Sequence, residues 1–124
     1  MLINENLTDL IIGKAMIVHS ALGPGLLESV YEACLAYELA QIGLNVERQK
    51  TLPVHYKTIV LDDGLRMDLL VASEVIVELK CVEKILPVHE AQLYTYLKLS
   101  GLKVGLLLNF YTRHLRDGIK RIVL

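Results

Sequence analysis

The spacing of apolar residues predicts two helices in the first third of the chain. Apolar side chains recur three or four positions apart over residues 5–22, which is typical of one face of an amphipathic helix. Gly23-Pro24-Gly25 predicts the end of this helix, because glycine suits a C-cap and proline cannot continue the hydrogen-bond ladder. A second helix is predicted from about Leu26 to Ile42, with Gly43 as its stop.

The pattern changes from helical to strand-like at Asn45. Residues 45–56 loosely alternate apolar and polar positions, and residues 58–61 form a further short strand. Asp62-Asp63-Gly64 contains the Asp-Gly turn signal. The sequence therefore predicts a hairpin that joins this short strand to the next one, which contains Asp68.

Beyond that point turn and helix signals separate the remaining strands. The predicted elements are a turn at 72–74, a strand at 75–80, a helix over 88–99 that begins near Pro87, and strands at 103–110 and 119–124. Two helices, a strand meander, a helix and further strands predict an α/β fold with a mixed central sheet flanked by helices. A length of 124 residues predicts a single domain over residues 1–124.

Charged residues interrupt two of the most apolar strands. Residues 75–80 read Val-Ile-Val-Glu-Leu-Lys, so Glu78 and Lys80 point to one face of the strand and Leu79 to the other. A strand this apolar is expected to be buried on both faces, where isolated charges are costly. Asp68 lies among apolar residues on the preceding strand. Two carboxylates and a lysine on adjacent core strands favour a divalent-metal site for phosphodiester chemistry.

The residue types suit magnesium in particular. Magnesium takes oxygen ligands in octahedral geometry and keeps several waters, so two carboxylates and a backbone carbonyl suffice. Asp68 and Glu78 would supply the carboxylates and Leu79 the carbonyl. Lys80 would orient or deprotonate the attacking water and offset phosphate charge. The alternative is a structural ion pair between Glu78 and Lys80.

Two motifs carry a resemblance to a known family. Asp68 followed by Glu78-Leu79-Lys80, with a hairpin before and a helix after, resembles the PD-(D/E)XK nuclease superfamily. The segment from Gly25 to Tyr31 resembles the GxxExxY signature of a family of small proteins placed in that superfamily. The resemblance covers residues 11–123 and implies a restriction-endonuclease-like core. Met67 stands where the motif's name has proline, a residue that shapes the chain and is not a ligand.

The resemblance extends the site to two helices. In this superfamily an acidic residue of the first core helix often completes the metal shell, and here that residue would be Glu28. The alternative for Glu28 is a first-turn glutamate favoured by the helix dipole, and Glu32, one turn on, is expected to be solvated. Gln92 and Tyr96 share a helix face at four-residue spacing. Related exonucleases use such a pair to hold the lysine strand and touch phosphate.

Composition limits the partners and the compartment. A hydrophobic content of 53% excludes intrinsic disorder, and a net charge of −1 argues against coating nucleic acid through bulk electrostatics. Cys34 and Cys81 lack metal or disulfide spacing, which fits a reducing compartment. Charges interrupt the apolar N-terminal stretch, so a soluble, cytoplasmic protein is expected. The best candidates for phosphate contacts form a C-terminal basic group, and the alternative is a solvated charged face. The group consists of Arg113, Arg116, Lys120 and Arg121.

The leading hypothesis is a Mg²⁺-dependent nuclease, with Mn²⁺ as a substitute ion, that cleaves nucleic acid. DNA is the expected substrate, and repair or defence the expected setting. The alternative is a non-catalytic or weakly catalytic module of the same fold that binds nucleic acid or protein. So small a nuclease has little surface to grip a duplex, and a homodimer would supply more. No membrane partner is expected.

Overall fold

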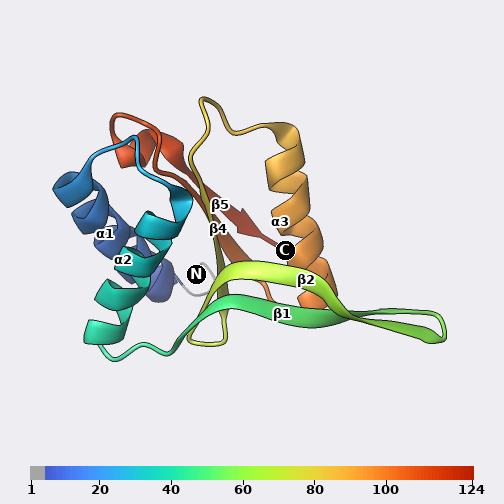
Figure 1. Cartoon of the computed structure of the whole chain (residues 1–124). Helices are drawn as coiled ribbons and strands as arrows, with labels where there is room; N and C mark the ends of the chain where they lie inside the picture. The colour runs from blue at the N-terminus through green and yellow to red at the C-terminus, as the bar shows by residue number, and fades with distance from the viewer. Residues whose placement is uncertain (1–4) are drawn as a thin grey trace.

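The computed structural model describes residues 5–124 and has a mixed five-stranded sheet at its centre (Figure 1). The strands lie in chain order across the sheet, and only β3 and β4 pair in parallel. The helices are α1 (Glu5–Leu22), α2 (Glu28–Gln41) and α3 (Pro87–Ser100), with a short 3-10 helix η1 (Leu115–Gly118). The strands are β1 (Val46–Tyr56), β2 (Ile59–Val71), β3 (Val75–Lys80), β4 (Val104–Asn109) and β5 (Ile119–Val123). The expected domain over residues 1–124 extends four residues beyond the described part.

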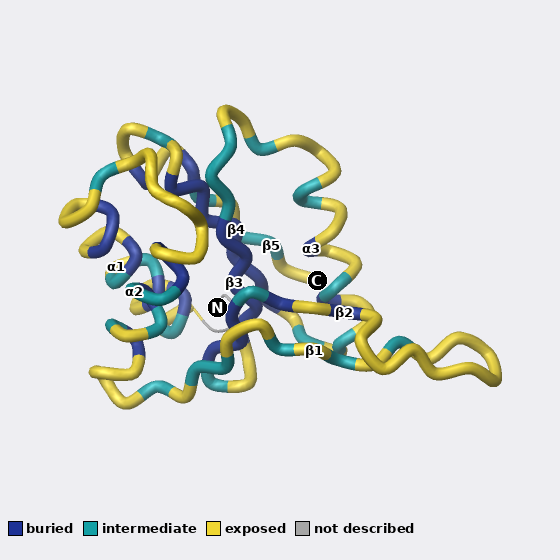
Figure 2. The backbone as a smooth tube through the Cα atoms, in the orientation of Figure 1, coloured by how far each residue is buried: buried dark blue, intermediate teal, exposed yellow. Residues whose placement is uncertain are grey.

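Helices cover both faces of the sheet, so its central strands are buried on both sides. Helices α1 and α2 lie on one face and α3 on the other (Figure 1). Alternation along β3 sends Val77 and Leu79 into the first layer and Ile76 into the second. Figure 2 shows β3 and β4 as the most buried part of the chain. The α/β fold with a mixed sheet flanked by helices is confirmed.

The β1–β2 hairpin corrects two predictions. The chain reverses at Lys57 and Thr58, with Lys57 at φ +53°, and not at Asp62-Asp63-Gly64, which lies inside β2. The predicted separate strand at 58–61 is wrong for the same reason. Gly64 is needed for a close approach and not for a turn, because a Cβ there would overlap the side chain of Val54 across the hairpin. The distal half of the hairpin extends beyond the sheet and is exposed (Figure 2).

The parallel pair β3 and β4 is connected through α3, and a glycine sets how closely this helix packs. A Cβ on Gly105 of β4 would lie 2.7 Å from Cδ1 of Leu93, a fully buried residue of α3. Glycine at this position therefore lets α3 lie directly on the sheet. Within residues 5–124 no helix has the length and apolar character that crossing a membrane requires.

We expect Gly105→Ala to lower the free energy of unfolding by roughly 1–3 kcal/mol, because the added methyl group must displace Leu93. Gly13→Ala is the matched control: this exposed α1 position has no neighbour within 4 Å of the added Cβ. It should stabilise the protein by about 0.4–1 kcal/mol through helix propensity and a less flexible unfolded chain. Urea denaturation of both variants measures the difference, and equal stabilities would contradict this account of the α3 packing.

Candidate active site

The candidate site lies where β2 and β3 stop exchanging backbone hydrogen bonds. Their paired register runs from Val71 opposite Val75 to Leu69 opposite Val77, and Asp68 and Glu78 come next on each strand. At this point carboxylates replace the backbone acceptors. The Asp68 N–H donates to Glu78 Oε2 at 2.7 Å, and the Leu79 N–H donates to Asp68 Oδ2 at 2.9 Å. Each carboxylate therefore binds the opposite strand, and the two acidic groups lie together.

Glu78 is a buried acid with a strongly perturbed pKa. Its side chain lies in the core, and the residue is only 5% exposed. Burial, and secondly the Asp68 carboxylate, raise the pKa of Glu78 to about 8, with a smaller upward contribution from Glu28. The Asp68 N–H and the Lys80 ammonium partly oppose this shift. At pH 7 the carboxyl group of Glu78 therefore retains a proton. The positive charge near it is not sufficient to stabilise the ionised form.

The strand end that carries Lys80 is fixed by β4. The Lys80 carbonyl accepts a hydrogen bond from the Phe110 N–H at 2.9 Å. Beside it, the buried amide of Asn109 accepts from the Val82 N–H at 3.1 Å and donates to the Val82 carbonyl at 2.8 Å. Asn109 thus holds the segment that follows Lys80. Sequence reasoning missed this residue, although a polar side chain inside an otherwise apolar strand was a usable signal.

The segment from Gly25 to Tyr31 places the start of α2 beside the site. Gly25 has φ +101°, a conformation that favours glycine. The Tyr31 hydroxyl donates to the Gly23 carbonyl at 2.5 Å and accepts from the Leu26 N–H at 3.0 Å. Its fully buried ring stacks on Phe110 with centroids 4.5 Å apart. The loop before α2 is therefore anchored to the core.

Glu28, the first residue of α2, is exposed but faces the carboxylates. It lines the same pocket as Asp68 and Leu79. Its charge contributes to raising the pKa of Glu78, and it also adds to the effect of burial in raising the pKa of the Cys81 thiol. Glu28 therefore lies at the solvent side of the cluster and not in bulk solvent away from it.

The prediction that Glu32 is solvated is wrong, because the residue is buried. Only 6% of the residue is exposed, and both carboxylate oxygens have partners on β1. Oε2 accepts from Arg48 Nε at 3.1 Å, and Oε1 accepts from Gln49 Nε2 at 2.5 Å. Helical spacing could not show this, because the partners come from a strand that packs across α2 only in the folded chain.

Gln49 connects Glu32 to the β2 carboxylate. Its Nε2 also lies 3.4 Å from Asp68 Oδ1, and its Oε1 accepts from Arg66 Nε at 2.6 Å. Gln49 has φ +51°, a sparsely populated conformation for a residue other than glycine. The β1–β2 pairs on either side are Arg48 with Leu69 and Lys50 with Met67. The sequence contained no signal for this role of Gln49.

Gln92 and Tyr96 lie on the other side of the sheet. They hydrogen-bond each other at 3.3 Å on α3, and Tyr96 packs against the apolar layer that contains Ile76. Strand alternation from Ile76 places Glu78 and Lys80 toward that same face. Within residues 5–124 the hydrogen bonds of Gln92 and Tyr96 do not reach either of these residues.

Comparison with known proteins agrees with this geometry. A family model described as PD-(D/E)XK nuclease superfamily matches residues 5–122. The chain belongs to the PD-(D/E)XK nuclease superfamily. No curated protein matches the chain, and no solved structure does. The superfamily resemblance is thus confirmed, whereas membership of the GxxExxY family within it stays a prediction.

The donor set of this PD-(D/E)XK chain suits a hard divalent ion. Asp68 and Glu78 provide paired carboxylate oxygens, and an adjacent cation would relieve the cost of ionising Glu78. Within residues 5–124 no three His, Cys, Asp or Glu side chains form a ready ligand shell. The two carboxylates leave positions in the shell of such an ion for water or backbone oxygens.

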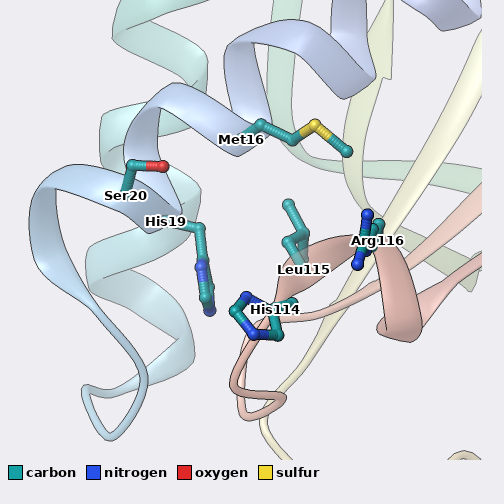
Figure 3. A pocket seen from close by; sticks show the side chains of 6 residues that line it. All are labelled: Met16, His19, Ser20, His114, Leu115 and Arg116. Atoms are coloured by element: carbon teal, nitrogen blue, oxygen red, sulfur yellow. The ribbon is translucent and has the colours of Figure 1, made fainter.

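A second pocket lies apart from the carboxylates, between α1 and η1 (Figure 3). His19 borders it, and His19 Nε2 donates to the Thr112 carbonyl at 2.8 Å, which ties α1 to the chain before η1. Arg116 lines this pocket, whereas Lys120 lines another, and strand alternation sends Lys120 and Arg121 to opposite faces of β5. The expected C-terminal basic group is therefore divided over the surface.

The raised pKa of Glu78 predicts a stability that falls with pH. The folded protein binds one more proton than the unfolded chain between the ordinary value of 4.5 and about 8. The free energy of unfolding in EDTA should therefore decrease across this range, by up to about 1.4 kcal/mol per pH unit from this group. Glu78→Gln should remove the slope and be more stable than the parent above pH 8, since Gln can still accept from the Asp68 N–H.

Chemical denaturation at several pH values measures this effect. Glu83→Gln changes an exposed carboxyl group outside the site and should retain the slope of the parent. An unchanged slope in Glu78→Gln would contradict the assignment of the proton to Glu78.

Proposed function

We propose that this protein is a Mg²⁺-dependent nuclease that hydrolyses phosphodiester bonds, with DNA as its substrate and repair or defence as its setting. The observation that carries the proposal is the reciprocal pair of Asp68 and Glu78, held at the point where β2 and β3 part. Lys80 follows two residues later on the same face. Membership of the PD-(D/E)XK superfamily supports the same reaction class.

The residues of the site have distinct proposed roles. Asp68 and Glu78 would hold the magnesium ion, with the Leu79 carbonyl and Glu28 as further ligands, directly or through water. The bound ion would activate a water and offset charge on the phosphoryl oxygens. Burial and the Asp68 carboxylate raise the pKa of Glu78 to about 8, and a divalent ion held beside it would favour the ionised form, so that Glu78 would lose its proton as the ion binds.

Lys80 and the α3 pair act on the substrate side in this proposal. The half-buried Lys80 would orient the attacking water and offset phosphate charge as an ammonium, or deprotonate that water as a neutral amine. Gln92 and Tyr96 lie on the sheet face toward which Lys80 points, and they would contact a phosphate there. A second copy of the chain would add surface for a duplex, and sedimentation analysis with and without DNA tests this.

We expect Mg²⁺ to raise the melting temperature of the parent and support cleavage of labelled DNA. Asp68→Asn should lose both effects but fold normally in EDTA, because Asn can still accept the Leu79 N–H and its repulsion of Glu78 is removed. Lys80→Met should keep the Mg²⁺-dependent shift and lose cleavage by about 100-fold or more. Thermal melts and assays on single-stranded DNA, duplex DNA and RNA provide the measurements.

Asp62→Asn is the matched control, since it removes an exposed carboxylate of the hairpin arm. It should preserve metal binding and cleavage. A Mg²⁺ shift without cleavage of any nucleic acid would favour a binding module instead. No Mg²⁺ shift, together with a loss of stability of roughly 3–5 kcal/mol in Glu78→Gln, would indicate a structural ion pair between Glu78 and Lys80 and refute the nuclease.

A further inference from the structure

A polar pocket of about 470 Å³ opens beside Asp68, between the start of α2 and strands β1 and β2. Its lining contains both acidic and basic side chains. The charged and amide residues that line it are Glu28, Glu32, Arg48, Gln49, Arg66 and Asp68. The pocket thus adjoins the proposed metal ligands and also offers positive charge.

The two arginines of this pocket are in different electrostatic states. Arg48 is neutralised, because its Nε forms a salt bridge of 3.1 Å with the buried Glu32. The Arg66 Nε–H donates a hydrogen bond to the neutral amide oxygen of Gln49, with Nε and Oε1 2.6 Å apart. Within residues 5–124 no carboxylate pairs with Arg66. Arg66 is therefore held in place while its positive charge stays available.

Gln49 accounts for this arrangement. Its Nε2 must face the Glu32 and Asp68 carboxylates, so its Oε1 faces the Arg66 guanidinium. The amide thereby contacts Arg66 through its oxygen and Asp68 through its nitrogen, and so links the two charged groups. The strained φ of +51° at Gln49 is the local cost of placing the amide there.

We propose that Arg66 forms a subsite for a phosphate of the nucleic acid, next to the phosphate that is cleaved, and that Gln49 is its positioning residue. This inference rests on the proposed function, because it takes nucleic acid as the substrate. Nε is used by Gln49, and the two Nη groups remain to bind a phosphate in the bidentate geometry that guanidinium favours. Such a contact aligns the strand with Asp68 across the pocket.

The test measures binding of a labelled single-stranded DNA to the Lys80→Met protein in Mg²⁺ by fluorescence anisotropy. Adding Arg66→Ala should weaken binding about tenfold or more. It should also reduce the salt dependence by about one phosphate contact. Arg66→Lys should retain the salt dependence but bind more weakly than the parent, because lysine cannot form the bidentate contact. Lys103→Ala removes an exposed cation just before β4, at the end of that strand away from Lys80, and should bind within about twofold of the parent.

Gln49→Ala tests the positioning role. Gln49→Ala alone should weaken DNA binding. Added to Arg66→Ala it should cause no further loss, because both changes remove the same contact. A purely structural role for Gln49 would instead lower the melting temperature and leave the effect of Arg66→Ala unchanged in size.

Metal binding separates failure of the subsite from failure of the nuclease. Arg66→Ala should keep the Mg²⁺-dependent melting shift, which reports folding of the variant as well. A parent-like DNA affinity in Arg66→Ala, with that shift intact, would overturn the subsite alone. A tenfold loss of DNA affinity in Lys103→Ala as well would also overturn it, since the effect would then be general electrostatics. Absence of the shift in the parent would overturn the nuclease itself.

Discussion

The reciprocal contact between Asp68 and Glu78 is the constraint on which the site depends. Strands β2 and β3 separate at this pair, and each carboxylate binds a backbone N–H of the other strand. The same contact holds the half-buried Asp68 beside the buried Glu78, and burial together with the Asp68 carboxylate raises the pKa of Glu78 to about 8. The end of strand pairing thus brings two carboxyl groups together, and a nearby cation would stabilise the ionised form of both.

The other elements hold this pair in an accessible position without enclosing it. Tyr31 anchors the loop that brings Glu28 to the solvent side, and Asn109 fixes the chain just after Lys80. Both residues are buried and use side-chain hydrogen bonds where regular secondary structure ends. The precision of the site therefore comes from the core and not from the exposed hairpin arm.

The pocket beside Asp68 carries both negative and positive side chains, so it can bind a cation on one side and an anion on the other. Arg48 neutralises Glu32, and Gln49 hydrogen-bonds both Arg66 and Asp68, which form no ion pair with each other within residues 5–124. What remains is acidic oxygen on one side of the pocket and a guanidinium on the other. This local arrangement is consistent with a chain whose net charge is only −1, because a few positioned charges suffice where bulk electrostatics are weak.

The sequence by itself determined the features that depend on local periodicity or on the cost of burying charge. The helices, the β3 strand and the unusual placement of Asp68 and Glu78 were all predicted from such patterns. Only the tertiary structure decided that the hairpin turns at Lys57 and that Glu32 is buried. The reason is physical: these features depend on which side chains lie across from one another after folding, and residue spacing within one element cannot reveal them.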